Sequence, residues 1–199
     1  MKKRNFLHAA LTGAIAGTGS TAIPAHAQNG PKAYSGPILL TVSGLIGAGN
    51  RGALDALDQM MAKQKIGFAK AHAFDFAMLT SMTAVTIKPT LEYDNKQHKL
   101  RGPLLMDVMK ASGVKPAQKT ALLLRAVDGY AALVPMAEVM KRRFILATHL
   151  DDRPMALGGL GPLWAVYDAD RFPDMAAKPV TERFSSCPWA IYHVEVKDS

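Results

Sequence analysis

One stretch, residues 147–174, constrains the fold of this chain most, because several structural signals follow one another closely within and just before it. The apolar run at residues 144–149 predicts a strand. Residues 151–154 predict a polar turn, and a glycine cluster then leads to a second apolar run at residues 162–167. We therefore expect two strands joined by a turn and a glycine cluster, with a binding site near this connection.

Short strand-like runs recur along the rest of the chain and alternate irregularly with short helical segments. Residues 37–46 and 119–127 are rich in aliphatic and β-branched residues, and residues 85–93 form a similar run that Pro89 interrupts. Helical spacing of apolar residues is confined to short segments such as residues 104–114. This pattern predicts an α+β domain built on a mixed β-sheet with short helices.

The first residues have the pattern of an export signal. Lys2, Lys3 and Arg4 precede a mildly apolar run that ends at a small-residue site before Gln28. The run is too short and too diluted for a membrane anchor. Lys3-Arg4 resembles a variant twin-arginine motif, so both the Sec and the twin-arginine routes remain open. We expect a signal peptide at residues 1–27, a single domain at residues 28–199, and a periplasmic or secreted protein without a membrane span after cleavage.

The charged residues and the single cysteine exclude several functions. The formal charge is +8, but the cations are scattered, which argues against nucleic-acid binding. Cys187 is the only cysteine, so we expect no internal disulfide or thiolate cluster and a small, half-buried side chain. His149 and the aspartates near it match no ligand spacing, so no metal site is predicted.

A glycine-rich loop offers a minor alternative. Gly47 to Gly52 has the spacing G-x-G-x-x-G and follows a predicted strand, and Asp75 ends the next one. Such a loop can bind the pyrophosphate of a dinucleotide when a helix follows it. A glycine-rich turn between a strand and a helix explains the same residues, and the later part of the chain lacks the alternation that a dinucleotide fold requires.

Several segments resemble the molybdopterin-binding domain family of the sulfite oxidase type, especially its small, exported, single-domain members. They are the run RGPLLMDVMKASGV at residues 101–114, the triplet Asp128-Gly129-Tyr130, the stretch 147–174 and the run PWAIYHVEV at residues 188–196. The resemblance covers residues 37–196. It implies the fold of that family and a pocket that, in the catalytic members, holds a molybdenum cofactor through a cysteine thiolate.

Two positions depart from the family pattern. The resemblance places Tyr93 where the catalytic members carry the cysteine ligand, and a phenol lacks the soft sulfur donor. Trp164 stands where cofactor-binding members carry an arginine, and an indole cannot replace a guanidinium against a phosphate. Both departures weaken the expectation of a thiolate-bound molybdenum centre.

We therefore expect a periplasmic module that binds a small molecule or a protein partner and has no cofactor. Its predicted pocket is lined by Tyr93, Arg101, Asp128, Tyr130, His149, Trp164 and Tyr167. The alternative is an enzyme, namely a molybdopterin-dependent oxidoreductase, or a redox accessory protein, with molybdopterin and molybdenum bound through unusual ligands. Position 93 discriminates between the two, because the metal chemistry requires a thiolate there.

Overall fold

The computed structural model describes residues 34–115 and 119–198. These residues belong to one compact unit, Pro31–Ser199. The predicted signal peptide at residues 1–27 lies outside the described residues, so its cleavage and its export route stay predictions. No helix among the described residues combines the length and the apolar character that crossing a membrane requires.

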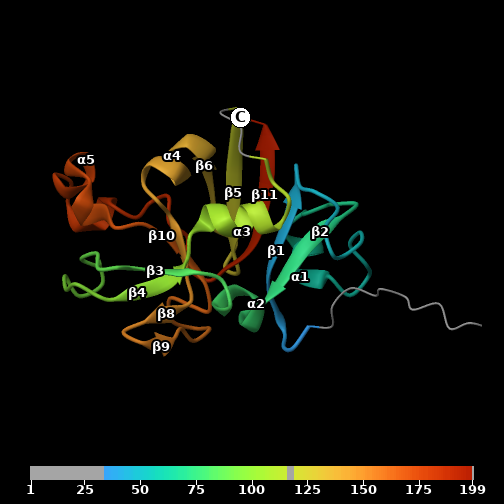
Figure 1. Ribbon diagram of the computed structural model, residues 1–199, viewed down its shortest axis with the longest axis horizontal. Helices are drawn as coiled ribbons and strands as arrows, with labels where there is room; N and C mark the ends of the chain where they lie inside the picture. The colour runs from blue at the N-terminus through green and yellow to red at the C-terminus, as the bar shows by residue number, and fades with distance from the viewer. Residues whose placement is uncertain (1–33, 116–118, 199) are drawn as a thin grey trace, which may run out of the picture. The chain divides into compact units, whose positions relative to one another are not determined.

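The largest sheet has five strands in the order β2-β1-β11-β5-β6 (Figure 1). Only β1 and β11 pair in parallel, and the other neighbours are antiparallel, so the sheet is mixed. The bounds of its strands are β1 (Ile38–Gly44), β2 (Ala71–Asp75), β5 (Thr120–Ala126), β6 (Ala131–Pro135) and β11 (Ile191–Asp198). This arrangement agrees with the predicted α+β class and its mixed sheet.

Two smaller sheets and several short helices complete the described fold. One sheet has the order β3-β4-β8-β9 and the other pairs β7 with β10. Their bounds are β3 (Ala84–Ile87), β4 (Leu100–Pro103), β7 (Ile145–Ala147), β8 (His149–Leu150), β9 (Arg153–Pro154) and β10 (Trp164–Val166). The helices are α1 (Gln59–Lys63), α2 (Phe76–Thr80), α3 (Leu105–Ala111), α4 (Met136–Lys141) and α5 (Pro173–Ala176), with short 3₁₀ helices η1 (Ala169–Arg171) and η2 (Val180–Glu182).

One hydrophobic core holds most of these elements together. The inner strand β1 is buried over four successive residues, with Leu40 and Val42 on one face of the sheet and the polar Thr41 and Ser43 on the other. Helix α3 buries Leu105, Val108 and Met109, and each such side chain contributes about 1.5–3 kcal/mol. Strands β7 and β10 are buried along their whole length. The two strands that the connection within residues 147–174 joins, β7 and β10, therefore both lie in the core.

The prediction of two strands joined by a turn and a glycine cluster is confirmed for this stretch. Strands β7 and β10 pair antiparallel, with Ala147 opposite Trp164. The run at residues 144–149 forms two strands, β7 and β8, rather than one. Asp151 and Asp152 form the tight turn between β8 and β9, with φ values of 48° and 65°. Short polar side chains tolerate this left-handed region better than most residues do.

The dinucleotide alternative is wrong. Strands β1 and β2 pair antiparallel, whereas a dinucleotide-binding unit needs parallel strands around its glycine loop. Helix α1 starts only at Gln59 and has five residues. Gly47 contacts the backbone of Gly113, where a Cβ atom would leave too little room, so packing explains this glycine. Asp75 is buried and its carboxylate accepts a hydrogen bond from the Met78 N–H at 2.7 Å, so it caps the N-terminus of α2.

One further prediction needs correction. The strand predicted at residues 85–93 ends at Ile87, and the residues after Pro89 form a loop.

Helix α4 buries Met136 fully, whereas Met140, four residues later, is 41% exposed. Helix α4 has a single buried face and ends after one further residue, so Met140 turns outward.

Candidate functional site

A cavity of ≈ 280 Å³ lies where three distant segments meet. The segments are the loop that follows β3, the turn between β5 and β6, and the chain that leads into β11. Its lining residues are Glu92, Tyr93, Ala126, Asp128, Tyr130, Thr181, Phe184, Ser185, Cys187, Pro188 and Trp189. Three of the seven predicted pocket residues, Tyr93, Asp128 and Tyr130, therefore share one cavity.

The loop that carries Tyr93 is fixed at its start by Asp170. The Asp170 Oδ2 atom accepts hydrogen bonds from the backbone N–H of Thr90 at 2.8 Å and from the Thr90 hydroxyl at 2.7 Å. Its Oδ1 atom accepts a hydrogen bond from Arg183 at 2.8 Å. Asp170 thus joins the loop to the segment that forms another wall of the cavity.

The end of the same loop is fixed by His98. Its Nδ1 atom lies 2.7 Å from Asp151 and its Nε2 atom lies 3.0 Å from Asp94. Hydrogen bonds to Asp151 and then to Asp94 raise the pKa of His98, so the imidazolium form is favoured. Asp151 and Asp170 both belong to the stretch 147–174, so this stretch supports the Tyr93 loop without lining the cavity itself.

The turn between β5 and β6 places Tyr130 at the cavity. The Tyr130 backbone N–H donates to Asp128 Oδ1 at 2.9 Å, which closes the Asp-Gly turn. The Tyr130 hydroxyl donates to the backbone oxygen of Ser185 at 2.6 Å. This bond connects two walls of the cavity and holds the ring between them.

The electrostatics of the cavity are set by acids and phenols. Partial burial and the neighbouring Glu92 carboxylate raise the pKa of Tyr93 to about 12, so its phenol is protonated at neutral pH. Burial raises the pKa of the Cys187 thiol to about 12 as well. Glu92 and Asp128 supply carboxylates. None of the described residues that line the cavity is Lys, Arg or His.

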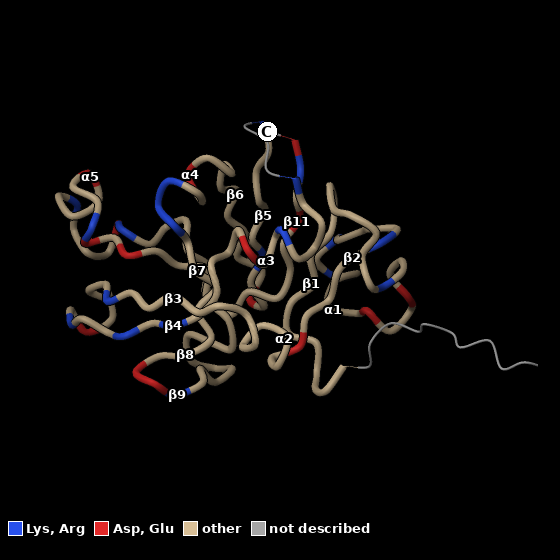
Figure 2. The backbone as a smooth tube through the Cα atoms, in the orientation of Figure 1, with Lys and Arg blue, Asp and Glu red and all other residues tan. Residues whose placement is uncertain are grey.

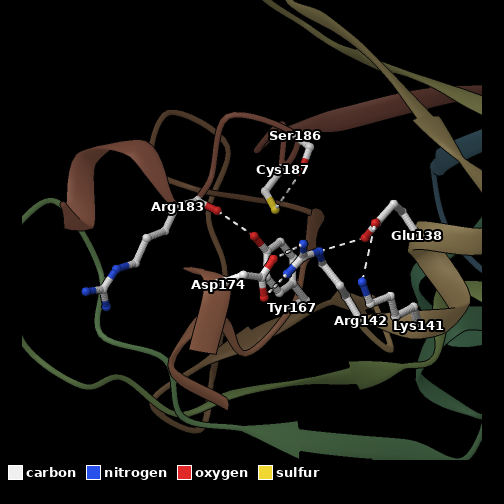
Figure 3. Close-up of polar contacts among 8 residues, drawn as sticks. All are labelled: Glu138, Lys141, Arg142, Tyr167, Asp174, Arg183, Ser186 and Cys187. Atoms are coloured by element: carbon white, nitrogen blue, oxygen red, sulfur yellow. Dashed lines mark hydrogen bonds and ion pairs between the residues drawn. The ribbon is translucent and has the colours of Figure 1, made fainter. Parts of the chain in front are cut away.

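Trp164 and Tyr167 lie in the hydrophobic core, with 0% and 1% of their surface exposed. The Trp164 indole N–H donates to the backbone oxygen of Cys187 at 2.8 Å. The Tyr167 hydroxyl donates to the backbone oxygen of Arg183 at 2.7 Å, as Figure 3 shows. The indole N–H of Trp164 and the hydroxyl of Tyr167 are therefore both hydrogen-bonded within the protein. Both residues lie outside the cavity, and their hydrogen bonds support the segment that carries Trp189.

A cation covers the outer edge of this buried aromatic group. Arg142 lies over the Tyr167 ring with its guanidinium carbon 5.3 Å from the ring centre. It also pairs with Glu138 and Asp174, each at 2.7 Å (Figure 3). The side chains of Arg142 and Tyr167 therefore form a structural unit at the end of α4.

Arg101 and His149 lie away from the cavity. They are opposite each other in the pairing of β4 with β8. The His149 Nδ1 atom lies 2.8 Å from the Thr148 hydroxyl, and the ring packs 5.8 Å from that of Phe76. Burial and then Arg101 lower the pKa of His149. The seven predicted residues are thus divided among three places, because the sequence pattern did not show which side chains point inward.

Sequence reasoning missed eight of the eleven residues that line the cavity, including Glu92 and Trp189. Glu92 directly precedes Tyr93 in the sequence, so its position was a usable signal. Trp189 forms an isolated bridge with Trp164, a pairing across 25 positions that no local pattern shows. Cys187, predicted to be half-buried, is 3% exposed.

A second polar pair lies inside the main sheet. Ser43 and His193 are almost fully buried, and the Ser43 hydroxyl lies 2.9 Å from His193 Nε2. Burial and then Arg125 lower the pKa of His193 to about 4. A neutral imidazole close to a serine hydroxyl has the chemistry of a general base. Its complete burial between β1 and β11 explains it better as a hydrogen-bonded core pair.

The cavity does not fit a thiolate-bound molybdenum cofactor. Tyr93 supplies a phenol in place of the soft sulfur of a thiolate, and the Cys187 side chain is buried, with 3% of its surface exposed. The carboxylates of Glu92 and Asp128 would repel the phosphate of such a cofactor, and no lining residue among those described offers it a cation. Within residues 34–115 and 119–198, His, Cys, Asp and Glu form no group of three or more that could hold a metal ion.

Comparison with known proteins gives a related fold. No family model matches the chain, and no curated protein sequence matches it. Among solved structures, the chain is similar to the crystal structure of the sulfane dehydrogenase SoxCD from Paracoccus pantotrophus, with a TM-score of 0.52 and 15% sequence identity. The match covers 80% of this chain and 38% of the SoxCD chain. At this identity the likeness shows the fold alone, and the chain spans well under half of the matched protein.

Proposed function

We propose that this chain is an exported ligand-binding module with a fold of the sulfite-oxidase-type molybdopterin-binding domains, and that it works without a thiolate-bound molybdenum centre. The single observation that carries the proposal is the cavity around Tyr93. The residue that replaces the family's cysteine ligand lies in a preformed pocket beside Asp128 and Tyr130. Under this proposal, the cavity takes the place of the family's cofactor pocket and has a different chemistry.

The anchoring of the Tyr93 loop supports binding by a preorganised site. Asp170 and His98 hold the two ends of the loop through charged hydrogen bonds. Tyr130 is fixed from the opposite wall by its bond to Ser185. Groups that are held in place before a ligand arrives lose less conformational entropy on binding. This suits a binding module in the periplasm whose partner is a small molecule.

A redox role is the second candidate, and one observation favours it. The similar solved structure is named a sulfane dehydrogenase, which is an oxidoreductase. Under this candidate the chain would bind molybdopterin and molybdenum through ligands other than the family's cysteine. The burial of the Cys187 side chain and the carboxylates of Glu92 and Asp128 weigh against it.

Elemental analysis and pterin fluorescence discriminate between the two candidates. The protein should be purified from its export route in cells that make the molybdenum cofactor, together with a molybdenum enzyme of the sulfite oxidase type as a loading control. We expect no pterin fluorescence and far less molybdenum than protein. Stoichiometric molybdenum would overturn the proposed function.

A further inference from the structure

Exposed aromatic side chains gather at the cavity around Tyr93. In the part of the chain that the structure describes, four aromatic residues are at least 36% exposed, and three of them line this cavity. They are Tyr93 at 54%, Tyr130 at 50% and Trp189 at 36%. Single exposed aromatic rings are common on protein surfaces, whereas several exposed rings gathered at one cavity are typical of a binding surface.

The lining of this cavity is acidic, although the chain as a whole has more basic than acidic residues. The sequence has 24 Lys and Arg against 16 Asp and Glu, yet the described lining has two carboxylates and no cation. The cations gather elsewhere. Lys141, Arg142 and Arg143 lie at the end of α4, where Figure 2 shows a continuous basic segment. With Arg171 they line a separate cavity of ≈ 290 Å³. The field at the aromatic cavity therefore favours positive charge.

Cations are the ligands that this combination of groups binds best. The ring faces of Trp and Tyr carry negative electrostatic potential and attract ammonium groups, most strongly when water is partly excluded. Glu92 and Asp128 add full negative charges beside the rings of Tyr93 and Tyr130. The phenol of Tyr93 is neutral at neutral pH, so the charge of the lining comes from the two carboxylates. A volume of ≈ 280 Å³ limits the occupant to a small molecule.

We propose that this cavity binds a small organic ammonium ion. Its positive group lies among the rings of Tyr93, Tyr130 and Trp189 and is neutralised by Glu92 and Asp128. This inference rests on the proposed function, because it names the class of ligand for the same pocket. It departs from the anionic cofactor that the family resemblance implies.

An NMR titration that follows the indole N–H signal of Trp189 tests the inference. Comparison with the Trp189→Phe variant assigns the signal, since Trp164 is the only other tryptophan. The probes are choline, ethanolamine and an uncharged analogue of choline in which a tert-butyl group replaces the trimethylammonium group. Sulfite and phosphate serve as anionic probes. We expect both cations to shift the signal, and choline to bind at least about tenfold more tightly than its uncharged analogue.

Matched variants locate the effect. Glu92→Gln and Asp128→Asn should each weaken choline binding and leave the uncharged analogue unchanged. Asn at position 128 keeps an oxygen for the Tyr130 N–H, so the turn is retained. Asp107→Asn removes an exposed carboxylate on α3 that pairs only with Lys110 at the surface, and it should have no effect.

Two results would overturn the cation inference: no shift with either ammonium probe, or an uncharged or anionic probe that binds as tightly as choline. Either result leaves the proposed function in place, provided that the purified protein contains no molybdenum. Stoichiometric molybdenum overturns the proposed function and the cation inference together.

Discussion

Asp170 binds both the backbone N–H and the hydroxyl of Thr90, at 2.8 and 2.7 Å, across 80 positions of sequence. The loop that begins at Thr90 carries Glu92 and Tyr93 to the cavity. Asp170 also pairs with Arg183, which precedes the segment on the cavity's opposite side. One carboxylate therefore sets the separation of two walls of the candidate site.

Thr90→Val should loosen the Tyr93 loop. The change keeps the shape of the side chain and removes only its hydrogen bond to Asp170, which contributes about 1 kcal/mol at this half-buried position. We expect a lower free energy of unfolding by denaturant and faster amide exchange in residues 90–98. Thr86→Val, at an exposed position of β3, is the matched control. Equal effects of the two variants would contradict the assigned role of Asp170.

The anchoring of the loop by His98 should depend on pH. Asp151 and Asp94 raise the pKa of His98 above 6.5, so its contribution is complete below pH 6.5 and is lost as the pH rises through the raised value. Amide exchange in residues 91–98 should therefore accelerate as the pH rises above 6.5 and passes through the raised pKa of His98, after correction for the intrinsic rate. The His98→Asn variant should lose this extra dependence. The same pH profile in that variant would exclude His98 as its source.

Gly102→Ala should destabilise the fold through β4. A Cβ atom at Gly102 would overlap the backbone of Leu146 and Ala147 in β7. Backbone cannot move aside as a flexible side chain can, so we expect a loss of about 1–3 kcal/mol or more. Gly52→Ala is the control, because nothing lies within 4 Å of its added methyl group, and it should change stability by less than about 0.5 kcal/mol. A Gly102→Ala protein as stable as the control would contradict the close approach of the β4 and β7 backbones at Gly102.

Tyr167→Phe and Tyr130→Phe should differ although both remove a hydroxyl that donates to a backbone oxygen. Tyr167 is buried, so its loss leaves the oxygen of Arg183 unpaired away from water and costs about 1–3 kcal/mol. Tyr130 is half exposed, and water can replace its bond to Ser185. Only Tyr130→Phe should alter ligand binding at the cavity. If Tyr167→Phe altered binding without loss of stability, Tyr167 would belong to the site after all.

Local signals predicted the elements of this fold well. The Asp75 cap, the Asp128-Gly129 turn and the strand that became β5 each depend on a few neighbouring residues. The composition of the cavity depends on distant contacts. Trp164 seemed suited to a pocket wall because its motif aligns with a cofactor segment, but the pairing of β10 with β7 turns its side chain into the core. Trp189 enters the cavity because it lies opposite Trp164.

The molybdenum content of the purified protein tests the central claim most directly, namely that Tyr93 has replaced the thiolate and left a pocket for another ligand. Wild-type protein and the Cys187→Ser variant should be compared after export from cells that load the control enzyme fully. We predict that both contain only trace molybdenum, because Tyr93 lacks a soft sulfur donor and Cys187 is buried, with 3% of its surface exposed. The carboxylates of Glu92 and Asp128 would also repel an anionic cofactor. One molybdenum atom per wild-type chain would contradict the account, and its loss in Cys187→Ser would identify Cys187 as the ligand.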